Sequence, residues 1–459
     1  MEQDDTIVAI STPPGMGGIA VIRVSGPEAI PLTQKVFQGG RDLTKSEGYR
    51  AYHGWIMDGD EPIDEVVLTI FRGPNSYTGE DVVEVNCHGG IFVSQRIVEL
   101  LIAHGACPAR PGAFTQRGFI HGKLDLCQAE AVADLIQART EASRKVAAYQ
   151  LEGRLSERLK EMRERLIEAC SLLEIELDFG EEDIEFVSRK DLIGMLCSLK
   201  EEMTAILASY DRGKVCREGI RMVIAGRPNV GKSSILNSLV ERERAIVTDI
   251  PGTTRDTVED VLDMEGLLFI ITDTAGIRAA QDPVEEFGVQ RAKQALETAD
   301  LILLIFDWSE SLTEEDETLI QLAENTKKKI IAIINKIDLS KKIDVQTLKK
   351  WIPKVPMIKV SALKQKGFPA LIGTLEKSVL ANGIPHAGEV VLTRIRHRES
   401  LNGAIRGIER AQDSLRSGMS QEFVVVDLRV ALDALGEITG QATTADILDR
   451  IFSEFCIGK

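Results

Sequence analysis

Residues 226–233, with the sequence Gly-Arg-Pro-Asn-Val-Gly-Lys-Ser, match the phosphate-loop pattern G-x-x-x-x-G-K-[ST]. Gly226 and Gly231 would let the backbone wrap closely around phosphate groups, so that successive N–H groups point inward. A helix expected after the loop would add the positive end of its dipole. Lys232 is expected to reach the terminal phosphates and the Ser233 hydroxyl to hold Mg²⁺. The alternative is a glycine-rich turn that binds no ligand.

Two later stretches have the residue types of loops that sense a nucleotide. The loop 248–256 is rich in hydroxyl groups, and a threonine there could reach Mg²⁺ and the γ-phosphate and release them after hydrolysis. The apolar run 268–273 predicts a buried strand that ends in Asp273. Gly276 follows this strand, and its N–H group could sense the γ-phosphate. The alternative is a pair of polar turns.

The identity of the base is predicted from Asn335 and Asp338, which follow another apolar run. A carboxylate accepts two hydrogen bonds, and guanine offers a matching pair of donors. Adenine has no such pair, so Asp338 would reject ATP. The Ala362 N–H group, after Ser361, would meet guanine O6. Because each motif comes at the carboxyl end of a predicted strand, their order favours a GTP site in a Ras-like P-loop domain with a mostly parallel sheet.

The elements that position these motifs belong to a chain with the composition of a globular protein. Its 459 residues suggest about three domains. The acidic N-terminus resembles neither a signal nor a transit peptide, and no apolar run is long enough to span a membrane, so a cytoplasmic protein is expected. Seven scattered cysteines without zinc-ligand spacing indicate a reducing compartment. With a net charge of −16, a polyanion must be bound by a local basic patch or by a partner, and the sequence reveals no such patch.

We divide the chain into an α+β N-terminal domain (1–120), a helical segment (121–216), the P-loop GTPase domain (217–380) and a second helical segment (381–459). Apolar and alternating runs predict strands at 6–10, 19–24, 66–71 and 82–85, and a helix at 91–103. Apolar spacings of three and four predict helices at 126–146, 151–173, 401–415, 426–435 and 445–455. The simplest arrangement is one helical bundle built from both helical segments, with the GTPase domain inserted between them.

The N-terminal domain contains charged and sulfur-containing residues that need not be functional. Cys87 and His88 are adjacent, so in a strand their side chains point to opposite faces and cannot easily bind one metal ion. We favour a turn at this point. From the residues alone, Arg23, Glu80 and Lys123 are expected to be solvated surface side chains.

The chain resembles the MnmE/TrmE family of tRNA-modification GTPases over essentially its whole length. The stretches that carry the resemblance are Thr-Pro-Pro-Gly-Met-Gly-Gly (12–18), Asn-Cys-His-Gly-Gly (86–90), Pro-Gly-Ala-Phe-Thr with Arg117 (111–117), the phosphate loop (226–234), Asp-Ile-Pro-Gly-Thr-Thr-Arg-Asp (249–256), Asp-Thr-Ala-Gly-Ile-Arg (273–278), Asn-Lys-Ile-Asp (335–338) and Cys-Ile-Gly-Lys (456–459). The GTPase motifs are shared with many relatives. The N-terminal pattern and the Cys-Ile-Gly-Lys tail make the resemblance specific.

The resemblance implies a nucleotide site that also contains K⁺. Its GTP-binding residues would be Gly226, Asn229, Val230, Gly231, Lys232, Ser233, Ser234, Thr248, Thr253, Thr254, Asp273, Gly276, Asn335, Lys336, Asp338, Ser361 and Ala362. The K⁺ ligands would be the Asn229 side chain, the Thr248 and Ile250 carbonyl groups and Thr253, and those of Mg²⁺ would be Ser233 and Thr254. A ring of neutral oxygens suits potassium, which would take the place of an arginine finger.

The resemblance also supplies the catalytic group that the motifs lack. Ile277 follows the Asp273 motif, so the glutamine that orients water in Ras-type enzymes is absent, and Arg278 cannot act as a base. The family implies that Glu285 takes this role, while Lys232 acts in catalysis at the terminal phosphates. The alternative is that Glu285 is a solvated residue at the start of a helix. Ordering of the switch loops would require two GTPase domains face to face, which couples hydrolysis to closure of a homodimer.

The flanking segments are implied to bind a folate. The N-terminal domain resembles a fold that dimerises and holds formyl- or methylene-tetrahydrofolate, the one-carbon donor. The matching residues are Arg23, Glu80, Lys123 and Lys459. Cys456 would act near the one-carbon site, the alternative being a small buried hydrophobic residue.

The resemblance implies a heterotetramer with the FAD- and NADH-using MnmG/GidA protein. Together they would install a carboxymethylaminomethyl-type group on C5 of the wobble uridine of certain tRNAs. The GTPase motifs alone would equally allow a regulatory GTPase in ribosome or complex assembly. Loss of the modified uridine in a deletion strain would indicate the first function, and accumulated ribosomal precursors the second.

Overall fold

The structure is a computed structural model that describes residues 5–178, 188–242, 244–245, 259–264, 266–273, 294–379, 383, 385–386 and 388–459. The chain falls into two compact units. The first contains residues 1–136, 149–203 and 399–459, and the second contains residues 137–148 and 204–398. The division of the chain at residues 120, 216 and 380 stays a prediction.

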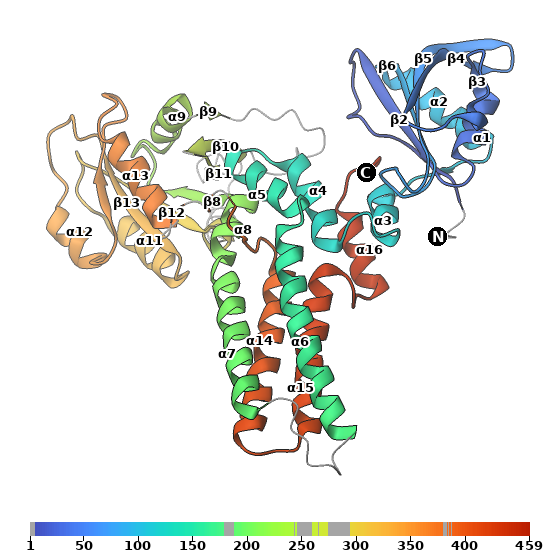
Figure 1. Ribbon diagram of the computed structural model, residues 1–459. Coiled ribbons are helices and arrows are strands. Elements are labelled where there is room, and N and C mark those ends of the chain that lie inside the picture. The colour runs from blue at the N-terminus through green and yellow to red at the C-terminus, as the bar shows by residue number, and fades with distance from the viewer. Residues whose placement is uncertain are drawn as a thin grey trace. The chain divides into compact units, whose positions relative to one another are not determined.

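The first unit begins with a seven-stranded sheet (Figure 1). Its strands are β1 (Ile7–Ile10), β2 (Ile19–Ser25), β3 (Phe37–Gln38), β4 (Arg50–Asp58), β5 (Glu61–Phe71), β6 (Val82–His88) and β7 (Cys107–Pro108). Their spatial order is β3-β4-β5-β6-β2-β1-β7, and only the β1–β7 ladder is parallel. Alternate residues of β5 are buried against α1 (Ala29–Val36) and α2 (Ile91–Ala103), and the short helix η1 (Leu43–Lys45) lies between β3 and β4 in the chain. The α+β N-terminal domain is therefore confirmed.

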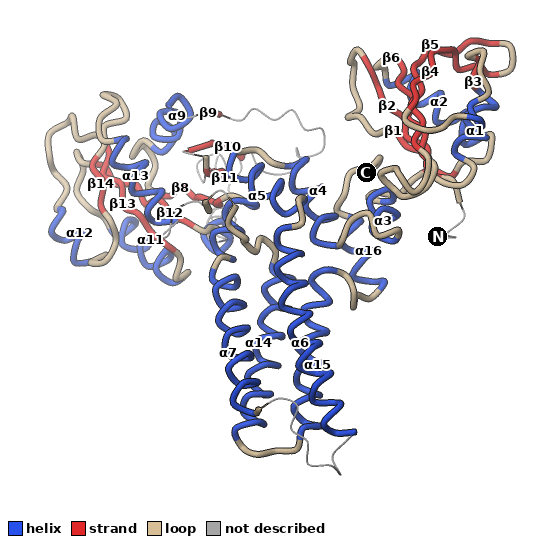
Figure 2. The backbone as a smooth tube through the Cα atoms, in the orientation of Figure 1, coloured by secondary structure: helices blue, strands red, loops and turns tan. Residues whose placement is uncertain are grey.

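The rest of the first unit is helical. Its helices are α3 (Ala113–Ile120), α4 (Leu126–Gln137), α6 (Arg154–Asp178), α7 (Arg189–Ala208), α14 (Ile395–Arg416), α15 (Gln421–Thr439) and α16 (Ala445–Ser453). Figure 2 shows α6, α7, α14 and α15 side by side as a bundle. Ion pairs join neighbouring helices around it: Arg158–Glu202, Lys200–Glu409, Arg410–Asp427 and Arg429–Glu174. Both helical segments of the sequence thus contribute to one bundle, as predicted.

The predicted helix at 126–146 is wrong in one respect, because two helices replace it. α4 ends at Gln137, and α5 (Glu141–Leu151) begins after Thr140. The Thr140 N–H donates to Ser143 Oγ at 3.1 Å, and the Ser143 N–H donates to Thr140 Oγ1 at 3.2 Å. This reciprocal cap starts a new helix. Apolar spacing runs through the break, so periodicity alone does not reveal it.

The second unit is built on another seven-stranded sheet. Its strands are β8 (Ile220–Ala225), β9 (Arg244–Ala245), β10 (Glu259–Met264), β11 (Leu267–Asp273), β12 (Leu301–Asp307), β13 (Lys329–Asn335) and β14 (Met357–Lys359). The order is β14-β13-β12-β8-β11-β10-β9, and the ladders from β14 to β11 are parallel. Every residue of β12 is buried, as a central strand of a covered parallel sheet requires.

Helices cover both faces of this sheet. α9 (Lys232–Arg242) and α13 (Phe368–Val379) pack on one face, whereas α11 (Glu314–Asn325) and α12 (Val345–Trp351) pack on the other. α8 (Tyr210–Glu218) precedes β8 in the chain. The predicted Ras-like domain with a mostly parallel sheet, inserted between the helical segments, is therefore confirmed. The carboxyl ends of β8, β11, β12 and β13 meet at one edge, which is where the sequence motifs lie.

Candidate nucleotide-binding site

The phosphate loop joins the end of β8 to the start of α9, as its sequence predicts. Asn229 and Gly231 have left-handed backbone conformations, with φ of 63° and 96°. A Cβ atom at Gly231 would lie 2.3 Å from Asn335 Nδ2, and one at Gly226 would lie 2.6 Å from the Ile305 carbonyl oxygen. Glycine is therefore required at both positions, because the neighbouring atoms leave no room for a side chain. Left-handed residues in such a loop form a concave set of N–H donors that suits an anion.

Lys232 is held by the loop itself. Its side chain is buried, and Nζ donates to the carbonyl oxygens of Gly226 at 2.9 Å and Arg227 at 2.8 Å. Ser233 and the Asn229 side chain are exposed at the same turn. The loop thus presents a cation, a hydroxyl group and an amide group together.

Asn335 connects three of the predicted motifs. Its Nδ2 donates to the Val230 carbonyl oxygen at 3.0 Å, and its Oδ1 accepts from the Ala362 N–H at 3.1 Å. The side chain is only 2% exposed. The phosphate loop, the Asn335 motif and the Ser361 motif therefore converge as predicted. In this structure the Ala362 N–H is bonded to Asn335, so the expected bond to guanine O6 would compete with that contact.

Asp338 presents an ionised carboxylate at the surface. Its Oδ1 accepts a hydrogen bond from Ser361 Oγ, and this bond lowers the pKa of Asp338. Ser361 Oγ in turn accepts from the Lys364 N–H at 3.1 Å. Ser361 is fully buried, so its hydroxyl group orients the exposed Asp338 carboxylate from the protein interior.

Lys336 braces the loop, and its partner Asp307 is a residue that sequence analysis missed. Lys336 Nζ donates to the Asn229 carbonyl oxygen at 2.7 Å and lies 2.6 Å from Asp307 Oδ2. Burial raises the pKa of Asp307, but hydrogen bonds from Lys336 and Ser309 bring the pKa below its usual value. The available signal was the position of Asp307 at the end of a buried strand, like Asp273.

Arg227 is the second missed contributor. Its Nε donates to Asp316 Oδ1 at 2.9 Å, and its Nη2 donates to Glu310 Oε2 at 3.2 Å. Asp316 is buried in the first turn of α11. Nothing in the phosphate-loop pattern indicates this contact, because the pattern leaves residue 227 unspecified.

Several expected site residues lie outside the described residues, namely Thr248, Ile250, Thr253, Thr254, Gly276 and Glu285. The backbone of Asp273 ends β11 and pairs with Ile224 of β8, which places it beside the phosphate loop. Within the described part of the chain, no group of three or more His, Cys, Asp or Glu side chains could hold a metal ion.

The N-terminal sheet brings two of the expected folate residues together. Arg23 donates to Glu84 Oε1 at 2.8 and 3.0 Å and to the Gly458 carbonyl oxygen at 3.2 Å. The Tyr77 ring lies 5.3 Å from the Arg23 guanidinium and 5.7 Å from Lys459 Nζ. Burial, and then the charge of Arg23, lower the pKa of Lys459. Two cations thus meet beside one aromatic ring, and Glu84 is a contributor that the sequence analysis missed.

The other expected folate residues are placed differently. Glu80 accepts from Ser25 Oγ at 2.7 Å and from Arg117 Nη1 at 3.0 Å. The solvated-surface interpretation is therefore wrong for Glu80, and it is also wrong for Arg23, but Lys123 is exposed. Cys456 is exposed, so its interpretation as a small buried hydrophobic residue is wrong.

Cys87 and His88 face opposite sides of the sheet, as predicted. Cys87 is buried, and burial raises the pKa of its thiol to about 11. His88 is exposed, and its Nδ1 lies 2.7 Å from Asp64 Oδ1. The predicted turn begins later than expected, because β6 continues to His88.

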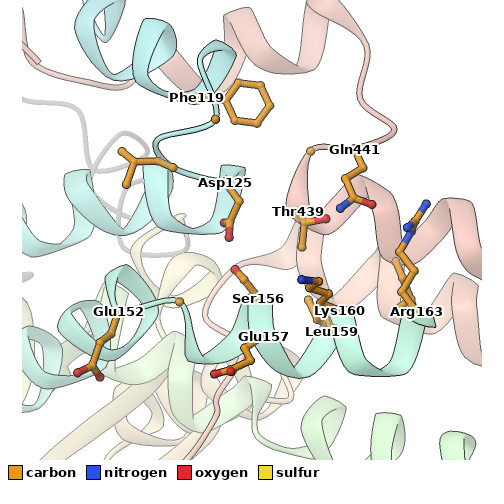
Figure 3. A pocket seen from close by; sticks show the side chains of 15 residues that line it. Phe119, Asp125, Glu152, Ser156, Glu157, Leu159, Lys160, Arg163, Thr439 and Gln441 are labelled. Atoms are coloured by element: carbon orange, nitrogen blue, oxygen red, sulfur yellow. The ribbon is translucent and has the colours of Figure 1, made fainter. Parts of the chain in front are cut away.

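A cleft of about 700 Å³ lies in the first unit (Figure 3). Lys160 and Arg163 of α6 line it together with Asp125, Thr439 and Gln441. None of the expected site residues lines this cleft. Among the described helices, none has the length and hydrophobicity needed to cross a membrane.

Comparison with known proteins agrees with the motifs over the full chain. The family model "MnmE helical domain" matches residues 126–456, and "GTP-binding protein TrmE N-terminus" matches residues 6–123. The tRNA modification GTPase MnmE of Natranaerobius thermophilus is 42% identical over 458 residues, which cover 99% of this chain and 100% of that protein. The protein of the same name from Clostridioides difficile is 42% identical over 459 residues, covering 99% of each chain.

Proposed function

This chain belongs to the MnmE family of tRNA modification GTPases, and from that premise we propose that it is a potassium-dependent enzyme that helps to install a carboxymethylaminomethyl-type group on C5 of the wobble uridine of certain tRNAs. The chain is a GTP hydrolase that acts in tRNA modification. The observation that carries the nucleotide part is the Asn335 junction, which joins the phosphate loop to the base-recognition motif. Membership of the family over the whole chain favours this function over a role in ribosome assembly.

The phosphate loop binds the nucleotide through its N–H groups and Lys232. In the structure, Lys232 contacts two neutral carbonyl oxygens. A phosphate oxygen is a stronger acceptor for an ammonium group because the bond is charge-assisted. We therefore expect Lys232 to leave those carbonyl groups for the β- and γ-phosphates. Asp338, already ionised and oriented by Ser361, accepts from the guanine N–H groups.

The residues present fit Mg²⁺ and K⁺. The Ser233 hydroxyl and the Asn229 amide are exposed beside the concave N–H groups of the loop. Each carries a neutral oxygen, and both ions are bound by oxygen ligands. Thr254 would complete the Mg²⁺ site, and Thr248, Ile250 and Thr253 would complete the K⁺ site. The ions supply positive charge that offsets the charge developing on the phosphate oxygens.

Glu285 is proposed to orient the attacking water. A carboxylate can accept a hydrogen bond from water, which the Ile277 side chain cannot do. We propose that the switch loops become ordered when two GTPase domains face each other in a homodimer. GTP turnover per molecule would then increase with protein concentration.

The N-terminal domain is proposed to hold a formyl- or methylene-tetrahydrofolate. Arg23 and Lys459 fit the carboxylates of a folate glutamate tail, and Tyr77 offers an aromatic surface for the pteridine ring. Because Glu84 already neutralises Arg23, Lys459 is the less compensated cation. Glu80 already accepts a hydrogen bond from Arg117, and its carboxylate could accept a further hydrogen bond from the folate. Lys123 and Cys456 are exposed, so they would contact the folate from its solvent side.

The proposed partners are tRNA and a FAD-dependent protein of the MnmG/GidA type, which would form a heterotetramer with this chain in the cytoplasm. The flavin would supply the redox chemistry from the partner protein. In this chain, GTP hydrolysis would drive the opening and closing of the homodimer.

GTP turnover in KCl and in NaCl, at several protein concentrations, tests the potassium-dependent mechanism. We expect turnover to be at least severalfold higher in KCl and to rise per molecule with concentration. Asn229→Ala should lose the response to K⁺, and Glu285→Ala should lose turnover while still binding GTP. Asn237→Ala, an exposed asparagine of α9, serves as the control and should behave like the wild type. Equal turnover in both salts at all concentrations would contradict the proposal.

A further inference from the structure

Six lysines lie on the segment 341–359, which leaves β13, forms α12 and enters the edge strand β14. They are Lys341, Lys342, Lys349, Lys350, Lys354 and Lys359. All six are exposed, and within the described part of the chain none forms an ion pair. We call residues 341–359 the lysine segment. Because the whole chain has a net charge of −16, this segment reverses the local sign of charge.

The single carboxylate within the lysine segment, Asp344, offsets at most one of the six positive charges. Hydrogen bonds from Thr347 and Gln346, and to a lesser extent the charge of Lys341, lower the pKa of Asp344. Asp344 Oδ1 accepts from the Gln346 N–H at 2.9 Å, and Oδ2 accepts from Thr347 Oγ1 at 2.8 Å. Both oxygens are therefore used to cap the start of α12.

An aromatic ring lies among the lysines. Lys359 Nζ is 4.9 Å and Lys341 Nζ is 5.4 Å from the centroid of the Trp308 ring. The Trp308 backbone is fixed, since its N–H donates to the Asn335 carbonyl oxygen at 2.9 Å and its carbonyl oxygen accepts from the Lys342 N–H at 3.0 Å. Two ammonium groups from different elements thus meet at one half-buried ring. The six lysines are close together in the sequence, but their arrangement around Trp308 depends on the fold, because the ring comes from the end of a different strand.

Structural roles explain only part of this arrangement. Lys359 would protect the edge strand β14 from pairing with another chain. Lys349 and Lys350, in the last turn of α12, complement the helix dipole. Neither role accounts for the other three lysines or for the meeting of two ammonium groups at Trp308.

We propose that the lysine segment and Trp308 form a surface that contacts the phosphate backbone of tRNA. This inference rests on the proposed function in tRNA modification. Nucleic acid is favoured over an acidic protein because protein interfaces have apolar centres that are depleted of lysine, and none of the large exposed hydrophobic residues lies in 341–359. RNA instead offers a dense row of phosphates for the lysines and unstacked bases for an aromatic ring.

The first test compares tRNA binding by the full-length wild-type protein and three triple variants of it. The probe is a labelled, unmodified tRNA transcript with a wobble uridine, measured by fluorescence anisotropy at several salt concentrations. For Lys341→Gln/Lys342→Gln/Lys359→Gln, we expect affinity to fall about tenfold or more at low salt. The slope of log K against log[salt] should decrease by about two to three, because each of the three lost phosphate contacts removes about 0.7–0.9 of a unit.

The matched control removes the same charge elsewhere. Lys45→Gln/Lys145→Gln/Lys160→Gln alters three exposed lysines, each within 4 Å of a carboxylate. It should keep the wild-type affinity and slope. GTP turnover, measured on the same preparations, should be unchanged in both triple variants, which separates this inference from the nucleotide mechanism. A second set, Lys349→Gln/Lys350→Gln/Lys354→Gln, should also weaken tRNA binding.

Tryptophan emission gives an independent result. Addition of tRNA should quench the emission of the wild-type protein, and Trp308→Phe should lose most of that change. Equal tRNA affinity and salt slope in the wild type and in both lysine-segment variants would overturn this inference but not the proposed function. If those variants instead lose binding to a protein partner while tRNA binding is unchanged, the surface docks protein and the inference is wrong. A wild-type protein that does not bind tRNA at all overturns both.

Discussion

A single buried amide, Asn335, holds the nucleotide site together. Its donor group bonds to Val230 of the phosphate loop, and its acceptor group bonds to Ala362 after the last strand. Aspartate would lose the donor and bury a charge, whereas leucine would leave two backbone groups without partners. The site is therefore arranged before a nucleotide arrives, which reduces the ordering cost of binding.

At this scale we predict a change of base preference in Asp338→Asn. The amide NH₂ group would face donor groups of guanine, so GTP affinity should fall about a hundredfold or more. Xanthosine triphosphate, which carries a carbonyl oxygen at position 2, should bind better than it does to the wild type. Competition with a fluorescent nucleotide measures both effects.

Asp344→Asn is the matched control, because this exposed aspartate caps α12 and asparagine caps equally well. It should leave both nucleotide affinities unchanged. Equal GTP affinity in the wild type and Asp338→Asn would show that Asp338 does not recognise the base.

The sequence predicted the convergence of those site residues that belong to motifs with a fixed spacing. Asn335, Asp338 and Ser361 meet because each follows a parallel strand, and parallel strands end at one edge. Asp307 also ends a parallel strand, so its place at this edge was predictable, but its pairing with Lys336 was not, and Asp316 has no such position. Their partners are distant in the sequence, and a single aspartate has no spacing that distinguishes it from a solvated residue.

At the scale of elements, the start of α11 has two functions. The Thr313 N–H donates to Asp316 Oδ2 at 3.0 Å, which caps the helix, while Asp316 Oδ1 accepts from Arg227 at 2.9 Å. A helix cap is thereby connected to the phosphate loop. The conformation of the loop depends on where α11 begins.

We predict that Asp316→Ala destabilises the protein and weakens nucleotide binding together. Loss of the cap and of a buried partner for Arg227 should lower the free energy of unfolding by about 1–3 kcal/mol. Denaturant unfolding and nucleotide titration measure the two effects.

Glu317→Ala, an exposed neighbour on the same helix, is the control and should change neither quantity. If Asp316→Ala loses stability but keeps full nucleotide affinity, the contact between the cap and Arg227 has no functional role.

Elements with a strong apolar pattern were predictable, and weakly patterned ones were not. The fully buried strand β12 has a continuous apolar run, and the amphipathic helices of the bundle follow from hydrophobic periodicity. β4 was missed because only two of its nine residues are buried, so its alternation is faint. The break before α5 depends on the Thr140–Ser143 cap, a polar signal that apolar spacing does not contain.

At the scale of the molecule, residues 456–459 lie against the N-terminal sheet and the start of α3 in the first unit. The Gly458 carbonyl oxygen accepts from Ser11 Oγ at 3.1 Å and from Arg23 at 3.2 Å. The Phe114 N–H donates to the Lys459 carbonyl oxygen at 3.2 Å. Gly458 has φ of 92°, and a Cβ atom there would lie 2.4 Å from the Ile10 carbonyl oxygen. Only glycine therefore fits at this position.

We predict that Gly458→Ala releases this segment from the sheet. The close approach to Ile10 and the left-handed backbone both disfavour a side chain. Hydrogen exchange at the Phe114 amide should become faster, because its acceptor moves away.

Ile457→Ala is the control, since this side chain is 61% exposed. It should leave the exchange rate at Phe114 unchanged. Full protection of Phe114 in Gly458→Ala would show that the segment stays bound despite the substitution.

The contact between Ser11 and Gly458 joins residues that are 447 positions apart, which has a consequence for synthesis on the ribosome. At about 5–20 residues per second, roughly 20–90 s pass between the translation of the two residues. Arg23 lacks one of its partners throughout that interval, whereas the GTPase domain can fold once residues 217–380 have been translated. A nascent chain would therefore acquire GTP binding before the two cations beside Tyr77 come together. Chains truncated after the GTPase domain would bind nucleotide but lack the contact of Lys459 with Tyr77.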